Sequence, residues 1–149
     1  MDNIDWNSLR PLDGSQHEAF EELCCQLALH ENSPVDSTFI RVGAPDAGVE
    51  CYWKLPGGDE WGWQAKFFLN PPGSSQWQQI DKSVKRALEK HSRLTRYIIC
   101  LPIDRQDPRI EGQDWFKDKW DDRVEKWEGW ADEEGVSVEF EYWGRSEIL

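Results

Sequence analysis

The chain has 149 residues, of which 38% are hydrophobic and 13% are aromatic, including 10 tryptophans. The length predicts one domain over residues 1–149, either alone or as the N-terminal module of a longer protein, and the aromatic content is typical of a folded chain. Acidic residues outnumber basic ones by 29 to 17, and the net charge of −12 excludes a basic nucleic-acid coat protein and argues against an anionic-membrane binder.

Two features predict a cytoplasmic location. The longest apolar run, Tyr97–Ile103, is too short to span a membrane, and the acidic start of the chain lacks the pattern of a signal peptide. The four cysteines form no CxxC pair, so reduced thiols are expected. The adjacent Cys24 and Cys25 are expected on two faces of a helix rather than in one metal site.

The first half of the chain predicts a helix followed by three strands. The helix begins at Asp13 or Ser15 and ends near Leu29, with an apolar stripe at Phe20, Leu23, Cys24 and Leu27. Strands are expected over 39–42, 49–55 and 60–68, the last two joined by a turn at 56–59. Strict alternation along 49–55 places Val49 on the face of Cys51 and Trp53.

The second half predicts a helix, a strand, a helix and a strand. The first of these helices runs from Ser74 or Ser75 to about His91 and buries Trp77, Ile80, Val84, Ala87 and Leu88. The unbroken apolar run 96–101 is typical of a strand covered on both faces. A helix over 114–132 and a strand over 136–143 follow. The predicted class is therefore α/β, with a mixed sheet between helices in the order α-β-β-β-α-β-α-β.

Polar side chains on two neighbouring strands carry the predicted chemistry. Asp46 and Glu50 lie in the segment Pro45-Asp46-Ala47-Gly48-Val49-Glu50, and Gln64 and Lys66 follow across the hairpin. Alternation places Gln64 and Lys66 on one face, and Glu50 can reach that face from the next strand. Carboxylate and amide oxygens are suitable ligands for Mg²⁺, and a nearby lysine can orient a water and stabilise negative charge.

These residues resemble the PD-(D/E)XK nuclease superfamily, in its Mrr-like branch where a glutamine precedes the x-Lys of the last motif. The resemblance implies a restriction-endonuclease-like fold and a Mg²⁺-dependent endonuclease, with Mn²⁺ as a substitute, that hydrolyses phosphodiester bonds of double-stranded DNA. By the resemblance Glu50 and Gln64 are metal ligands, Lys66 is catalytic, Asp46 opens the motif and also serves the metal, and Glu21 is a supporting helix carboxylate. Glutamate stands at position 50 where aspartate is commoner, so either Asp46 or Glu50 is the principal metal acid.

The expected DNA-binding surface is the helix that follows Lys66. Residues 76–103 contain six basic and two acidic residues, a net charge of +4 in an acidic chain. One helix face presents Gln79, Lys82, Arg86 and Lys90, which can follow phosphates or can be a solvated outer face. Related domains are N-terminal effectors of antiphage proteins such as CD-NTase-associated nucleases and antiviral STAND NTPases. The resemblance thus implies a homo-oligomer, or fusion to an NTPase or sensor region, and activation by oligomerisation.

Structural interpretations remain open beside the functional ones. Asp46 can serve only to shape a turn, and Glu50 and Lys66 can form a cross-strand ion pair on a solvated face. Base stacking on Trp115 or Trp130 is a further alternative. The rival function is a catalytically inactive nuclease-fold module that binds other proteins.

Overall fold

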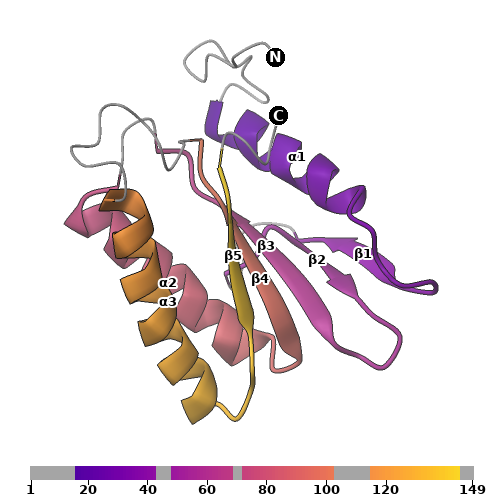
Figure 1. Cartoon of the computed structure of the whole chain (residues 1–149). Coiled ribbons are helices and arrows are strands. Elements are labelled where there is room, and N and C mark those ends of the chain that lie inside the picture. Colours follow the sequence, from indigo (N-terminus) through magenta and orange to yellow (C-terminus); the bar gives the residue numbers. More distant parts are fainter. Residues whose placement is uncertain (1–15, 43–47, 69–71, 103–114, 145–149) are drawn as a thin grey trace.

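The computed structural model describes residues 16–42, 48–68, 72–102 and 115–144, which form three layers with a sheet in the middle (Figure 1). The order of elements is the predicted one. The elements are α1 (Gln16–Leu29), β1 (Thr38–Arg41), β2 (Cys51–Lys54), β3 (Glu60–Ala65), α2 (Ser74–Lys90), β4 (Leu94–Cys100), α3 (Trp115–Glu133) and β5 (Glu139–Trp143).

The five strands form one mixed sheet in the order β1-β2-β3-β4-β5. β1, β2 and β3 are joined as an antiparallel meander, whereas β3, β4 and β5 run parallel. A parallel neighbour requires a crossover connection, and α2 and α3 lie in the β3–β4 and β4–β5 connections. The predicted α/β class with a mixed sheet between helices is therefore confirmed.

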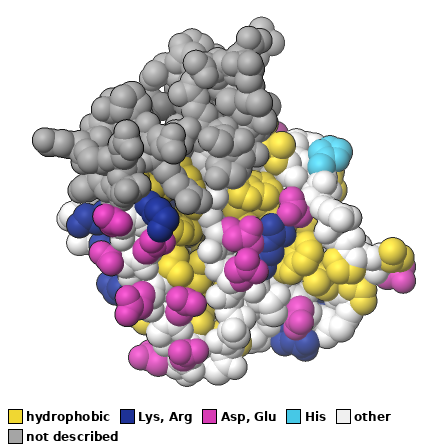
Figure 2. Space-filling view, viewed as in Figure 1, with side chains coloured by type: hydrophobic (Ala, Val, Ile, Leu, Met, Phe, Trp, Pro, Cys, Tyr) yellow, Lys and Arg dark blue, Asp and Glu magenta, His cyan; other side chains and the backbone are white. Residues whose placement is uncertain are grey.

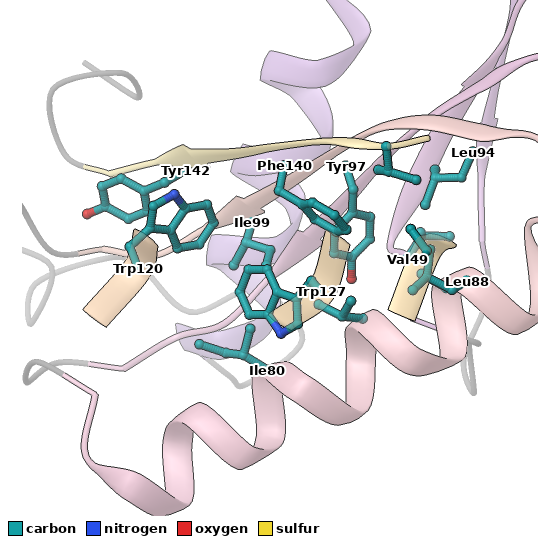
Figure 3. Close-up of a cluster of buried hydrophobic side chains, with 14 of the residues drawn as sticks. Val49, Ile80, Leu88, Leu94, Tyr97, Ile99, Trp120, Trp127, Phe140 and Tyr142 are labelled. Atoms are coloured by element: carbon teal, nitrogen blue, oxygen red, sulfur yellow. The ribbon is translucent and has the colours of Figure 1, made fainter. Parts of the chain in front are cut away.

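The helices bury two hydrophobic clusters against opposite faces of the sheet. α1 packs on β2 and β3, while α2 and α3 lie side by side on the other face. Figure 3 shows side chains of α2, α3, β4 and β5 meeting in the larger cluster. The apolar stripe predicted for α2 is fully buried in this cluster, as expected from its period of 3.6 residues.

Two predictions about the strands are wrong. β3 ends at Ala65 rather than Phe68. Val49 does not share a face with Cys51 and Trp53: it packs in the α2 and α3 cluster, whereas they pack in the α1 cluster. The reason is that the chain bends at Gly48 and again at Glu50 and β2 begins only at Cys51, so the alternation of the strand does not extend back to Val49.

The prediction that Cys24 and Cys25 lie on two faces of a helix is also wrong. Both thiols are buried in the α1 cluster, together with Cys51 and Cys100. Phe20 and Ala28 are buried on α1 as well, so the helix presents a broader arc to the sheet than a narrow stripe provides. All four cysteines are free thiols in the core.

The visible surface carries both signs of charge. In Figure 2, acidic side chains occur across the face that is shown, and basic side chains lie between them. Within the described ranges, no helix has the length and apolar composition that a membrane span requires.

Candidate active site

Gly48, which lies shortly before β2, contacts both α2 and β4. Tyr97, a fully buried residue of β4, donates a hydrogen bond from its hydroxyl to the Gly48 carbonyl, at 2.5 Å. A Cβ added at Gly48 would lie 2.3 Å from the Ser83 carbonyl oxygen and 2.6 Å from the Ala87 nitrogen, both in the α2 backbone. Only glycine permits this close approach together with the positive φ. The position of Glu50, two residues further on, depends on this contact.

Backbone hydrogen bonds hold the three motif residues although two of them lie outside the assigned strands. The Glu50 N–H donates to the Trp63 carbonyl at 2.7 Å, which extends the pairing of β2 with β3 by one residue. The Lys66 N–H donates to the Cys100 carbonyl at 2.9 Å, which extends the pairing of β3 with β4. The motif residues are therefore held by a central strand and its two neighbours.

Glu50, Gln64 and Lys66 line one cleft of about 520 Å³. The cleft lies at the carboxyl end of β3, where ligand sites of parallel sheets commonly occur. α2 forms its other wall. The complete lining is Glu50, Gln64, Lys66, Gln79, Lys82, Ser83, Lys85, Arg86 and Glu89.

Gln64 is a buried polar residue in this wall, with 7% of its surface exposed. Its Nε2 donates a hydrogen bond to the Ala65 carbonyl at 3.2 Å. The amide nitrogen can only donate, so Oε1 is the atom that can accept a hydrogen bond or bind a cation.

The electrostatics of the cleft centre on Lys66. Burial lowers the pKa of the Lys66 ammonium, and the negative charges of Glu50 and Glu21 partly oppose this shift. Glu21 lies on α1 and is bound to His17 one turn away, with Nε2 and Oε1 2.5 Å apart. Glu21 thus acts on Lys66 through its charge, although it is not among the residues that line the cleft.

The remaining predicted site residues divide into two groups. Gln79, Lys82 and Arg86 line the cleft, as their spacing on α2 implies. Lys90 is exposed on the last turn of α2 and is not part of the lining, and Asp46 falls outside the described residues.

Three lining residues were not singled out from the sequence: Ser83, Lys85 and Glu89. The signal that points to Lys85 and Glu89 is their spacing, because each lies three residues after Lys82 or Arg86 on the same helix.

Two residues of the cleft carry oxygen atoms that suit Mg²⁺. The carboxylate of Glu50 and the amide oxygen of Gln64 are both hard oxygen donors, and Mg²⁺ commonly binds one or two protein ligands and retains several waters. No group of three or more His, Cys, Asp or Glu side chains suited to a metal occurs in the described ranges. The cleft therefore offers two oxygen donors of the kind that Mg²⁺ binds.

Comparison of the chain with protein-family models, with curated proteins and with solved structures finds no match.

Proposed function

We propose that the protein is a Mg²⁺-dependent endonuclease that hydrolyses phosphodiester bonds of double-stranded DNA, of the PD-(D/E)XK type with a QxK motif. The observation that carries the proposal is the shared cleft, in which Glu50, Gln64 and Lys66 face the basic side of α2. Phosphodiester hydrolysis needs a metal-binding carboxylate, a cation near the reacting phosphate and a basic surface for the flanking phosphates. This cleft contains residues for all three roles.

Each residue has a separate role in the proposed reaction. Glu50 and Gln64 would hold Mg²⁺ through oxygen, and the chemistry that the ion would supply is acidification of water and neutralisation of phosphoryl charge. Lys66 orients the attacking water and stabilises the negative charge that develops on the phosphate, while Lys82 and Arg86 bind neighbouring phosphates.

The fold supports the same proposal. The resemblance requires a helix, three strands, a helix and a strand, with both motifs around a hairpin. α1 to β4 follow that order, and the motif residues flank β2 and the end of β3. We therefore propose the restriction-endonuclease-like fold, with α3 and β5 as its extension.

Control by assembly forms the second part of the proposal. A net charge of −12 repels DNA, so a single protomer has only its local basic surface with which to bind. We propose a cytoplasmic antiphage effector whose protomers are brought together by homo-oligomerisation or by fusion to an NTPase or sensor region. The free state of all four thiols is compatible with a reducing compartment.

Plasmid cleavage in the presence of Mg²⁺ tests the catalytic role. Glu50→Ala, Gln64→Ala and Lys66→Ala should each reduce the rate on the order of 10²–10³-fold, the usual effect of removing one group that stabilises a transition state. Lys54→Ala is the matched control, because it removes an exposed lysine at the end of β2 that does not line the cleft. Circular dichroism and thermal melting establish that each variant is folded.

Three results would contradict the proposal or its parts. Cleavage that persists in EDTA would rule out the metal-dependent mechanism. A parental rate for Glu50→Ala would exclude Glu50 as the principal metal acid and direct the test to Asp46. No Mg²⁺-dependent cleavage, either by the isolated chain or by a fused oligomer, would favour the inactive protein-binding module.

A further inference from the structure

Two lysines from different helices meet over one tryptophan beside the cleft. The Nζ of Lys85 on α2 lies 4.6 Å from the centroid of the Trp130 ring on α3. The Nζ of Lys126, also on α3, lies 5.2 Å from the same centroid. Trp130 is half-buried, and α2 and α3 pack side by side (Figure 1). The indole therefore holds both ammonium groups by cation–π attraction.

This arrangement concentrates positive charge on an otherwise acidic helix. The carboxylate that lies near Lys126 belongs to Asp81, with 3.7 Å between Nζ and Oδ2. That carboxylate already accepts hydrogen bonds from Arg123 at 2.5 Å and from the Trp127 indole at 2.8 Å. Asp81 is therefore shared by two cations, Arg123 and Lys126. Lys85 adds a further positive charge across the groove between the helices.

The paired lysines are continuous with the cleft. Lys85 lines the cleft together with Lys66, Lys82 and Arg86, and it also contacts Trp130. Cationic side chains therefore extend from the cleft over α2 to α3, and in the cleft lining they outnumber the two carboxylates, Glu50 and Glu89. An extended polyanion that has one phosphate in the cleft would pass along this row.

We propose that Lys85, Trp130 and Lys126 form an accessory phosphate-binding ridge for the DNA backbone that flanks the phosphate in the cleft. The inference rests on the proposed function. Trp130 organises the two lysines and does not stack on a base, because two ammonium groups already lie over its ring. The ridge does not discriminate between DNA sequences, because ammonium groups that contact phosphates bind every duplex in the same way.

Fluorescence anisotropy of a labelled 30-base-pair duplex, titrated in EDTA at several salt concentrations, tests the ridge without any cleavage. Lys85→Gln/Lys126→Gln should reduce the slope of log affinity against log salt by about 2, because each lost phosphate contact removes about one unit. A duplex of unrelated sequence should show the same loss. Trp130→Phe should leave the slope unchanged and weaken binding several-fold, since phenylalanine holds a cation less well than tryptophan.

The matched control is Lys54→Gln/Lys117→Gln, which removes the same charge from exposed positions on β2 and the start of α3. Its salt slope should equal that of the parent. An unchanged slope for Lys85→Gln/Lys126→Gln, with a reduced slope for Lys82→Gln/Arg86→Gln, would overturn the ridge and leave the proposed function standing. If the control variant and the ridge variant showed the same reduction in salt slope, the ridge would be overturned as well. A parent chain that does not bind the duplex even at low salt would overturn both proposals.

Discussion

Replacing Gly48 by alanine should both destabilise the protein and displace Glu50. The new Cβ would lie 2.3 Å from the Ser83 carbonyl oxygen and 2.6 Å from the Ala87 nitrogen. These are backbone atoms inside α2, so neither can rotate away as a side chain would. The loop before β2 must therefore move, and with it the carboxylate of Glu50.

Gly57→Ala provides the matched comparison because it carries the same backbone strain without the contact. Gly57 has a φ of +100°, but nothing lies within 4 Å of an added Cβ. A residue held at positive φ costs about 1–3 kcal/mol, which both variants incur. Overpacking against a fixed backbone adds about 1–3 kcal/mol at Gly48 alone. In a domain of this size the added cost lowers the melting temperature of Gly48→Ala by about 3–10 °C relative to Gly57→Ala.

Thermal melting and urea unfolding of both variants measure this difference, and plasmid cleavage measures its effect on the site. Gly48→Ala should lose stability and cleavage together, whereas Gly57→Ala should keep cleavage at temperatures where it is folded. Equal melting temperatures for the two variants would refute the argument from close approach. Parental cleavage by Gly48→Ala would show that the placement of Glu50 does not depend on the loop contact.

Two further predictions concern the core. Asp81→Ala should lower the free energy of unfolding, measured by urea titration, by about 2–3 kcal/mol, because it leaves the buried Trp127 indole N–H without its acceptor. The control Asp122→Ala, at an exposed position, should change the free energy of unfolding by less than about 0.5 kcal/mol. The four buried thiols should react with a disulfide reagent only as fast as the native protein opens and should all react at once in denaturant; rapid labelling of the native protein would contradict their burial.

Periodicity predicted the buried face of α2 because successive turns of a helix present the same face to the sheet, whereas it missed the burial of Cys24 and Cys25 together on α1. The α2 stripe is buried as predicted. Strand boundaries were less predictable because alternation says nothing about where pairing ends. Pairing of β3 stops at Ala65 except for one further bond at Lys66, although the sequence pattern continues to Phe68.

The motif residues and part of the facing helix were predictable from sequence, whereas two other contacts were not. Glu50, Gln64 and Lys66 were expected on one face, and they line one cleft. The place of Val49 was missed because the chain bends at Glu50, between Val49 and the start of β2, and alternation assumes a continuous strand. The contact of Lys85 with Trp130 was missed because it joins two helices, and the sequence pattern does not predict how those helices pack against each other.

The salt dependence of binding connects the acidity of the chain with its proposed control by assembly. Suppose that each protomer makes four phosphate contacts, through Lys82, Lys85, Arg86 and Lys126. Between 50 and 200 mM salt its affinity for DNA would then fall about 150-fold, at about 0.9 log units per contact and per decade of salt. A fused dimer or tetramer offsets this loss, because the second and later contacts form at an effective concentration near the millimolar range.

The isolated chain should therefore cleave plasmid only at low salt, and a fused oligomer should cleave it at about 150 mM salt at the same protomer concentration. The oligomer carrying Lys82→Glu/Arg86→Glu is the control, and it should lose this tolerance to salt. If monomer and oligomer lost activity at the same salt concentration, assembly would not be acting through shared phosphate contacts. The acidity of the chain would then need another explanation, because only under the assembly mechanism does it keep an unassembled protomer from cleaving host DNA.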